Sequence, residues 1–529
     1  MIKEYRRQIL IIILLVLLSH GLMLFNDGVY WDDWTTFHVK DSAVWTTYKN
    51  AGLPLKAFIH VTFNDFPLLY RLTILISHLG AALILFYILT TIKEIVLTDK
   101  LVLALIFGLF PVNFAKVGQV MAPHMFCVFM FFMATYLLLQ YVFKKRWIYY
   151  LISCCCFFLS FQLESTIVLS IPVFMLIAYH EKLDMDLRKS LGKLKKYFFF
   201  ALVPLIYWEA RRLFFPPVDL FVGYNSVDLR AILRTPKYSV YSAENNLLLP
   251  IKNAFVMNLG KTDGQIYFLV LLLLAVIVYR IMKSQITIFD RKNIYFVVLG
   301  IVFYNLAILP YVAVGRGGWD YGWGWRTRDQ ILVPLGAAFI ILYGLKVLFN
   351  RLRLKRNILE ILLSLLLAGF FLSNVKNCLV FQRAWFKQVS FIEAMKRDDV
   401  VRNHTTFLVD DRTKRLNVLD EPWRFYEFTG MLKAAFGDEK RFAVDKDEAR
   451  NRAMFEEIKQ KYAKLSPYPD YNMSDYLWHD PEYLMTVEFG EERISLRETF
   501  SLIFMKYINP DSYRDHIRRM IKIKCTPLA

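Results

Sequence analysis

The chain has 529 residues, of which 56% are hydrophobic and 16% are aromatic. This composition excludes an ordinary soluble protein of this size and predicts a membrane protein with several transmembrane helices. The formal net charge is +19, but residues 376–529 contribute only +2 and residues 1–375 contribute +17. We therefore expect the basic residues to orient membrane helices, and we do not expect the chain to bind nucleic acid.

The membrane helices are predicted from apolar runs, because a helix needs roughly 20 apolar residues to cross a bilayer. The first run follows Lys3, Arg6 and Arg7 as a signal peptide would, but no small-residue cleavage site follows, so we predict a retained helix. Eleven segments fit, at about 8–25, 67–92, 101–119, 122–143, 147–163, 165–180, 197–213, 265–282, 294–312, 330–348 and 357–374.

The connectors between these segments predict the orientation of the chain. With the N-terminus in the cytoplasm, the inner connectors and the N-terminus hold 23 of the 38 Lys and Arg residues of 1–375. Positive charge is enriched on the cytoplasmic side of membrane proteins. The sequence thus predicts a multi-pass cell-membrane protein with two domains. Residues 1–375 form the transmembrane domain, and residues 376–529 form an extracytoplasmic C-terminal domain.

Two outer connectors have features that predict more than a simple link between helices. In residues 26–66, the part from Val44 to Phe63 is predicted to form a short amphipathic helix on the membrane surface. The connector Ala313–Asp329 holds five Gly, three Trp and three Arg. This density of Gly predicts irregular backbone close to a ligand or another chain.

The C-terminal segment has the mixed polarity of a small α/β domain. Two short strands are predicted, at Thr405–Val409 and Arg441–Val444. Helices are predicted at Trp385–Arg397, Trp423–Phe436 and Glu448–Lys464. Cys378 and Cys525 are candidates for a disulfide only if this domain faces an oxidising compartment, and the sequence leaves their pairing open.

An acidic and aromatic stretch follows the first membrane helix directly. Phe25–Trp34 reads FNDGVYWDDW and places Asp27, Asp32 and Asp33 among three large aromatic residues. Carboxylates beside hydrocarbon are costly and tend to have a function. Aromatic rings at this depth also occur as an ordinary interfacial belt. Asp27 is best interpreted as a helix-end or turn residue.

Several motifs in the first 175 residues resemble the C-class (GT-C fold) glycosyltransferases, which are polytopic enzymes that take a sugar from a polyprenyl-phosphate carrier. The protein O-mannosyltransferase branch has a paired acidic motif in its first outer loop, where this chain has Asp32 and Asp33. Tyr70–Leu79, YRLTILISHL, is similar to the second helix of that branch and places His78 where the branch often has a His.

The resemblance continues with two departures. FLSFQLESTIVLSIP, at 158–172, is similar to the segment that carries a Lys-Glu pair in the family, with Glu164 at the Glu and Leu163 in place of the Lys. In the turn after the third helix the family often has Glu and Asp, where this chain has Lys116 and His124. The resemblance therefore implies a first acidic site at Asp32 and Asp33 and a second acidic site at Glu164.

The two adjacent acids suit the chemistry that the resemblance implies. Transfer of a sugar to a hydroxyl needs a carboxylate that takes the proton of the acceptor. Adjacent carboxylates can divide such roles, because like charges separate their pKa values. Asp32 or Asp33 is the predicted base. The alternative is that both are solvated loop residues that cap a surface helix, and Glu164 has a similar alternative as an acid near a helix N-terminus.

Five outer arginines are candidates for binding the phosphate of the donor, because guanidinium groups match phosphate oxygens. They are Arg211, Arg212, Arg316, Arg326 and Arg328. Arg326 and Arg328 are favoured, because the following QILVPLGAAF resembles a late helix of the family that contains an Arg. The alternative for all five is contact with lipid headgroups. His78 and His124 are candidates for polar contacts, with packing inside the bundle as their alternative.

The resemblance implies an inverting glycosyltransferase that moves a sugar from a lipid-linked donor to a glycan, lipid or protein acceptor on the outer face. A transporter or flippase of lipid-linked sugars is one alternative, although inverted repeats and charges at mid-membrane, which are typical of transporters, are missing from the sequence. A surface-glycan polymerase or ligase is another alternative and would share the donor. The need for a divalent cation or another cofactor stays open, because three acids without a DxD motif do not decide it.

Overall fold

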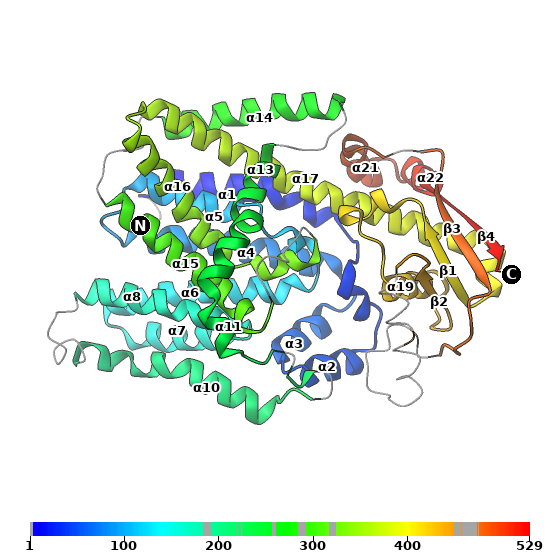
Figure 1. The fold of residues 1–529 in the computed structure, drawn as a ribbon, viewed down its shortest axis with the longest axis horizontal. Coiled ribbons are helices and arrows are strands. Elements are labelled where there is room, and N and C mark those ends of the chain that lie inside the picture. The colour runs from blue at the N-terminus through cyan, green and yellow to red at the C-terminus, as the bar shows by residue number, and fades with distance from the viewer. Residues whose placement is uncertain are drawn as a thin grey trace. The chain divides into compact units, whose positions relative to one another are not determined.

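The computed structural model describes residues 4–182, 192–218, 221–223, 225–255, 261–283, 292–316, 324–448, 456, 473, 475–492 and 494–528. The chain divides into two compact units (Figure 1). Unit 1 comprises Met1–Gly21, Thr73–Lys116 and Met121–Val375, and unit 2 comprises Leu22–Leu72, Val117–Val120 and Lys376–Ala529. Unit 2 therefore combines the first predicted outer loop with the C-terminal part of the chain.

Long apolar helices dominate the chain. Seven helices among the described residues are long and apolar enough to cross a membrane, which supports the prediction of a membrane protein. They lie at Arg6–Phe25, Pro67–Thr90 (α4), Met121–Lys144 (α6), Gly264–Met282 within α14 (Lys261–Met282), Asn293–Ala313 (α15), Val333–Arg351 (α16) and Arg356–Arg397 (α17). The first of these includes α1 (Arg6–His20).

The other four predicted segments are helical but shorter than a usual transmembrane helix. They form α5 (Leu97–Leu109), α7 (Trp147–Ser160), α8 (Ser170–Glu181) and α10 (Phe198–Phe214), with 13, 14, 12 and 17 residues. The helix α5 ends early because Pro111 disfavours helical backbone at the residue before it, and Phe110 has an extended ψ of 118°. The number of eleven spans stays a prediction.

Small residues let helices of unit 1 pack closely. Gly336 of α16 faces α15 at Tyr304, where a Cβ atom on the glycine would lie 2.5 Å from the backbone nitrogen of Tyr304. This is the small-residue packing that membrane helices use. Three shorter helices also belong to unit 1, namely α11 (Leu229–Leu233), α12 (Thr235–Ala243) and α13 (Leu249–Phe255).

In unit 2, the first loop folds into short helices. A 3₁₀ helix, η2, covers Trp31–Thr35 and contains both acids of the candidate site. The helices α2 (Asp41–Asn50) and α3 (Pro54–Phe63) follow, in the region where a surface helix was predicted.

The C-terminal part of unit 2 contains a four-stranded mixed sheet. Its strands are β1 (Thr406–Asp411), β2 (Phe442–Asp445), β3 (Tyr483–Phe489) and β4 (Ile521–Pro527), in the order β2-β1-β3-β4. Strand β1 is parallel to β2 and β3, whereas β4 is antiparallel to β3. The helices are α18 (Asp399–Asn403), α19 (Phe425–Phe436), α21 (Leu496–Ile508) and α22 (Pro510–Met520).

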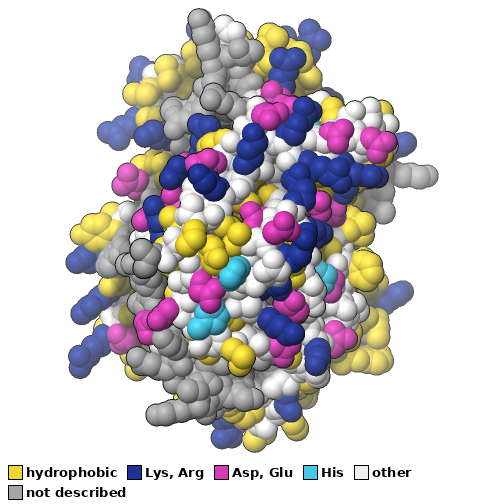
Figure 2. Space-filling view, turned by 90° about the vertical axis from the view of Figure 1, so that its right-hand side faces the viewer, with side chains coloured by type: hydrophobic (Ala, Val, Ile, Leu, Met, Phe, Trp, Pro, Cys, Tyr) yellow, Lys and Arg dark blue, Asp and Glu magenta, His cyan; other side chains and the backbone are white. Residues whose placement is uncertain are grey.

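Both strands predicted for the tail are confirmed, as β1 and β2. The helix predicted at Trp423–Phe436 is confirmed as α19, and the one at Trp385–Arg397 is the end of the 42-residue α17. The helix predicted at Glu448–Lys464 lies almost entirely outside the described residues. None of the six cysteines, Cys378 and Cys525 included, forms a disulfide. Figure 2 shows a face on which Lys and Arg side chains alternate with Asp and Glu side chains.

Candidate functional site

The buried carboxylate of Asp33 holds two distant pieces of unit 2 together. Its oxygens accept hydrogen bonds from the backbone N–H groups of Gln119 and Val120, at 2.7 and 2.8 Å. Burial raises the pKa of Asp33 to about 6, whereas the positive charge of Arg71 and the two amide donors act in the opposite direction. Asp33 is thus a fixed group with both oxygens engaged.

Asp32, the next residue, has a different environment. It is half-buried and accepts a hydrogen bond at 3.0 Å from the phenol of Tyr426, which lies on α19. Burial raises the pKa of Tyr426 well above its ordinary value, so the phenol keeps its proton and serves as a donor. The adjacent acids therefore differ in accessibility, because Asp33 is buried and Asp32 is partly exposed.

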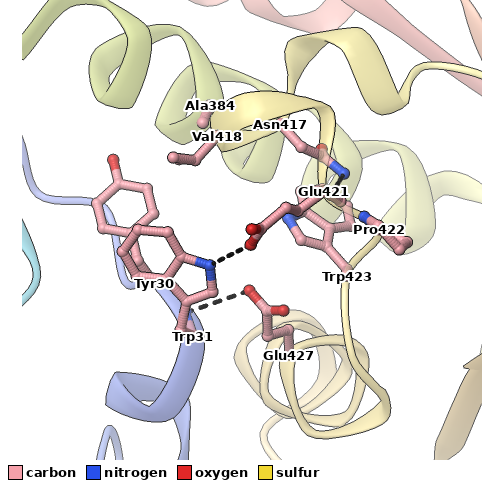
Figure 3. Close-up of a pocket in the computed structure, with 9 residues that line it drawn as sticks. All are labelled: Tyr30, Trp31, Ala384, Asn417, Val418, Glu421, Pro422, Trp423 and Glu427. Atoms are coloured by element: carbon pink, nitrogen blue, oxygen red, sulfur yellow. Dashed lines mark hydrogen bonds between the residues drawn. The ribbon is translucent and has the colours of Figure 1, made fainter. Parts of the chain in front are cut away.

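Trp31, the residue before Asp32, is held by two glutamates of the C-terminal part of unit 2. Trp31 has a φ of 51°, an uncommon conformation for a bulky residue. Its backbone N–H donates to Glu427 at 3.3 Å, and its indole N–H donates to Glu421 at 3.2 Å. Figure 3 shows both carboxylates turned toward Trp31 in a small pocket that Tyr30 and Trp423 also line. These contacts stabilise the conformation of the loop.

Glu427 has a second structural task. Its other carboxylate oxygen accepts the backbone N–H of Arg424 at 2.9 Å and so completes a capping box at the start of α19. Burial raises the pKa of Glu427 to about 7. One buried carboxylate thus caps α19 and anchors the loop that carries Asp32 and Asp33.

Arg71 is a buried cation of unit 2 that the sequence analysis did not select. It is fully buried, and its Nη2 group donates to the carbonyl of Gly28 at 2.7 Å. Its guanidinium lies 5.9 Å from the ring centre of Tyr30. A charged arginine in an apolar helix costs free energy, so such a residue is a candidate for a function. The Arg71 in YRLTILISHL was therefore a signal that the sequence already contained. Arg71 balances part of the charge of Asp33.

In unit 1, Glu164 forms an ion pair with Arg211. Glu164 begins the 3₁₀ helix η4 (Glu164–Leu169), and Arg211 lies near the end of α10. The adjacent Arg212 instead pairs with Glu209 at 2.7 Å on the exposed side of α10. The charge of the predicted second acid is therefore partly neutralised by Arg211.

Two of the other three predicted arginines of unit 1 lie near the same acid, Asp329. Arg316 and Arg328 lie 3.8 and 3.7 Å from Asp329, and the guanidinium of Arg328 stacks 4.3 Å above Trp325. Arg326 is exposed on the same 3₁₀ helix, η8 (Trp325–Gln330). Residues 317–323 of the predicted Gly-rich turn lie outside the described residues.

The two predicted histidines have unequal surroundings. His78 is buried, its Nε2 lies 2.8 Å from the carbonyl oxygen of Gly108, and its ring packs 4.9 Å from that of His20. The ammonium of Lys116 lies 2.9 Å from Nε2 of His20. His124 is half-buried on α6. His78 thus belongs to a packed polar cluster of unit 1.

The predicted site residues fall into two groups. Asp32 and Asp33 belong to unit 2, whereas Glu164, the five arginines and both histidines belong to unit 1. The sequence analysis missed Tyr426 and Glu427, because nothing local to them indicates that they contact a loop almost 400 residues earlier.

No group of three or more His, Cys, Asp or Glu side chains is arranged to hold a metal ion within the described ranges. Comparison of the chain with protein-family models, with curated proteins and with solved structures gives no match.

Proposed function

We propose that this chain is a membrane glycosyltransferase that moves a sugar from a polyprenyl-phosphate donor to an acceptor hydroxyl. The observation that carries the proposal is the unequal pair of acids in the first loop. Asp33 is immobilised by two backbone amides, whereas Asp32 is half-buried and oriented by a phenol. General-base catalysis needs a carboxylate that is both accessible and held in orientation, and Asp32 meets these two conditions.

The proposal includes a GT-C-like fold with eleven spans. In it the N-terminus lies in the cytoplasm, and the first loop and the C-terminal domain lie outside the cell membrane. The bias of Lys and Arg toward the predicted inner connectors supports this orientation. The four shorter apolar helices are compatible with crossing where the bundle thins the bilayer or where neighbouring turns extend them.

In the proposed reaction, the oxygen of the acceptor hydroxyl forms a bond with the anomeric carbon of the sugar. The bond between that carbon and the phosphate oxygen breaks, and its electron pair leaves with the polyprenyl phosphate. Asp32 takes the proton of the hydroxyl. The negative charge on the leaving phosphate needs a cation to neutralise it, and a guanidinium group is suited to this.

The test uses the purified full-length protein and a panel of polyprenyl-phosphate sugars, with consumption of each donor followed by mass spectrometry. We expect Asp32→Asn to abolish transfer, whereas Asp41→Asn, which alters an exposed acid of the same loop, should not. Full activity of Asp32→Asn would refute the assignment of the base. Movement of an intact lipid-linked sugar across a bilayer, without its consumption, would favour a flippase. Asp33→Asn is less informative, because it also removes an acceptor from buried backbone amides.

Tyr426 is a positioning residue in this proposal. It is 6% exposed, and its phenol donates a hydrogen bond to Asp32. We expect Tyr426→Phe to lower kcat with an unchanged KM for the donor and an unchanged unfolding temperature, because only the orientation of the base is lost. An unfolding temperature that falls together with activity would assign Tyr426 to stability instead.

A further inference from the structure

The helix α21 of unit 2 is apolar on two opposite faces. Thr499, Leu502 and Ile503 are buried against unit 2. The opposite face exposes Phe500 by 45%, Phe504 by 40%, Tyr507 by 59% and Ile508 by 82%. Because residues three and four apart lie on the same side of a helix, these four side chains form one stripe along two turns. These four side chains stay exposed although α21 is packed into unit 2, and we call this second face the outer stripe.

The outer stripe continues into the end of a membrane helix. Phe25 is the last residue of the apolar segment Arg6–Phe25, which is long enough to cross a bilayer. The ring of Phe25 packs against the rings of Phe504 and Tyr507, with centres 6.3 and 6.1 Å apart. The point where the chain leaves the membrane thus lies in direct contact with the outer stripe.

A charged contact fixes α21 at this place. The ammonium of Lys506 forms an ion pair with Asp27 at 2.7 Å and lies 4.7 Å above the ring of Trp385. Asp27 belongs to the stretch between Phe25 and the acids of the candidate site. This ion pair explains Asp27 better than a role as a simple turn residue, because it ties the start of the first loop to α21.

We propose that the outer stripe of α21 docks on the lipid bilayer, at the interface beside the end of the first membrane helix. A large exposed apolar face indicates a partner. Continuity with Phe25 identifies lipid as that partner, because the apolar surface of a membrane helix already lies in lipid. Aromatic rings favour the interfacial depth, and the phenol of Tyr507 suits a side chain with one wet end. Arg497, exposed on the same face, suits contact with anionic headgroups.

This docking does not depend on the proposed transferase activity. It would anchor the C-terminal part of unit 2 at the membrane surface through a helix that only lies on the bilayer. It would also hold the first loop at a constant depth, because Lys506 and Asp27 connect the two.

Photocrosslinking of the full-length protein in nanodiscs of phosphatidylethanolamine and phosphatidylglycerol tests the proposal. The variants Phe504→p-benzoylphenylalanine and Ile508→p-benzoylphenylalanine place the probe on the outer stripe. Leu477→p-benzoylphenylalanine is the matched control, because Leu477 is 83% exposed in the same unit but is not on α21. The substitutions replace exposed side chains and should leave the fold intact, which circular dichroism of each variant verifies.

After irradiation, mass spectrometry of the protein is expected to show lipid adducts at positions 504 and 508 and none at position 477. Equal lipid labelling at all three positions would overturn the proposal, because it would show no preference for α21. Crosslinks from position 504 to a second copy of the chain would also overturn it and would assign the stripe to a dimer interface. Absence of lipid adducts at both stripe positions would have the same consequence.

Discussion

Replacing Asp411 by asparagine should destabilise unit 2 strongly, because Asp411 is one half of a buried ion pair. Its carboxylate lies 2.6 Å from the ammonium of Lys387, and both side chains are fully buried. The positive charge of Lys387 holds the pKa of Asp411 below its ordinary value, so the carboxylate is ionised at neutral pH. The ammonium also donates to the side-chain oxygen of Asn417 and the carbonyl of Thr413, which are uncharged, and lies 4.1 Å above the ring of Trp423. Asp411→Asn therefore leaves a buried cation without its counter-charge, at a cost of about 3–5 kcal/mol.

The assay is thermal or denaturant unfolding of the purified full-length protein in detergent, read by a probe in unit 2. Asp410→Asn is the control on the same strand, because the partners of Asp410 are the partly exposed Arg412 and Lys446, and such pairs contribute about 0–1 kcal/mol. The double variant Lys387→Met with Asp411→Asn removes both charges and should cost clearly less than the sum of the single variants. Additive costs, or equal effects at positions 410 and 411, would refute the reasoning.

Two further predictions concern one group that titrates and one close contact. Because burial raises the pKa of Glu427 to about 7, its contribution to stability is complete below its ordinary pKa near 4.5 and is lost as the pH rises through about 7. Relative to Glu427→Gln, the wild-type protein should lose about 3 kcal/mol between about pH 4.5 and 8, and a difference independent of pH in unfolding experiments would contradict this. Gly336→Ala should cost about 1–3 kcal/mol through its contact with Tyr304, whereas Gly344→Ala on the same helix meets no atom within 4 Å and should be neutral or stabilising. Equal unfolding temperatures for the two alanine variants would contradict this, because they would show that α15 and α16 accommodate the added methyl group without cost.

Hydrophobic runs predicted the membrane class and the places of most helices, because a long apolar run has few folded alternatives in a bilayer. They did not predict where helices end. Phe110 and Pro111 end α5 within a run that reads as a continuous span, and α17 extends from an apolar half into a polar half without interruption. In the tail, β1 and β2 were recognisable as short apolar runs bounded by polar residues. No prediction was made for β3, β4, α21 and α22, whose patterns are weaker.

The sequence by itself determined the class of protein, the places of its long apolar helices and the adjacent acids Asp32 and Asp33, because apolar runs and neighbouring charges are local properties. Only the tertiary structure decided that the two acids differ. Asp33 receives amide hydrogen bonds from residues 119 and 120, and Asp32 receives a phenol from α19, near the other end of the chain. The environment of a side chain depends on partners that folding brings from distant positions, and no local pattern records which partners those are.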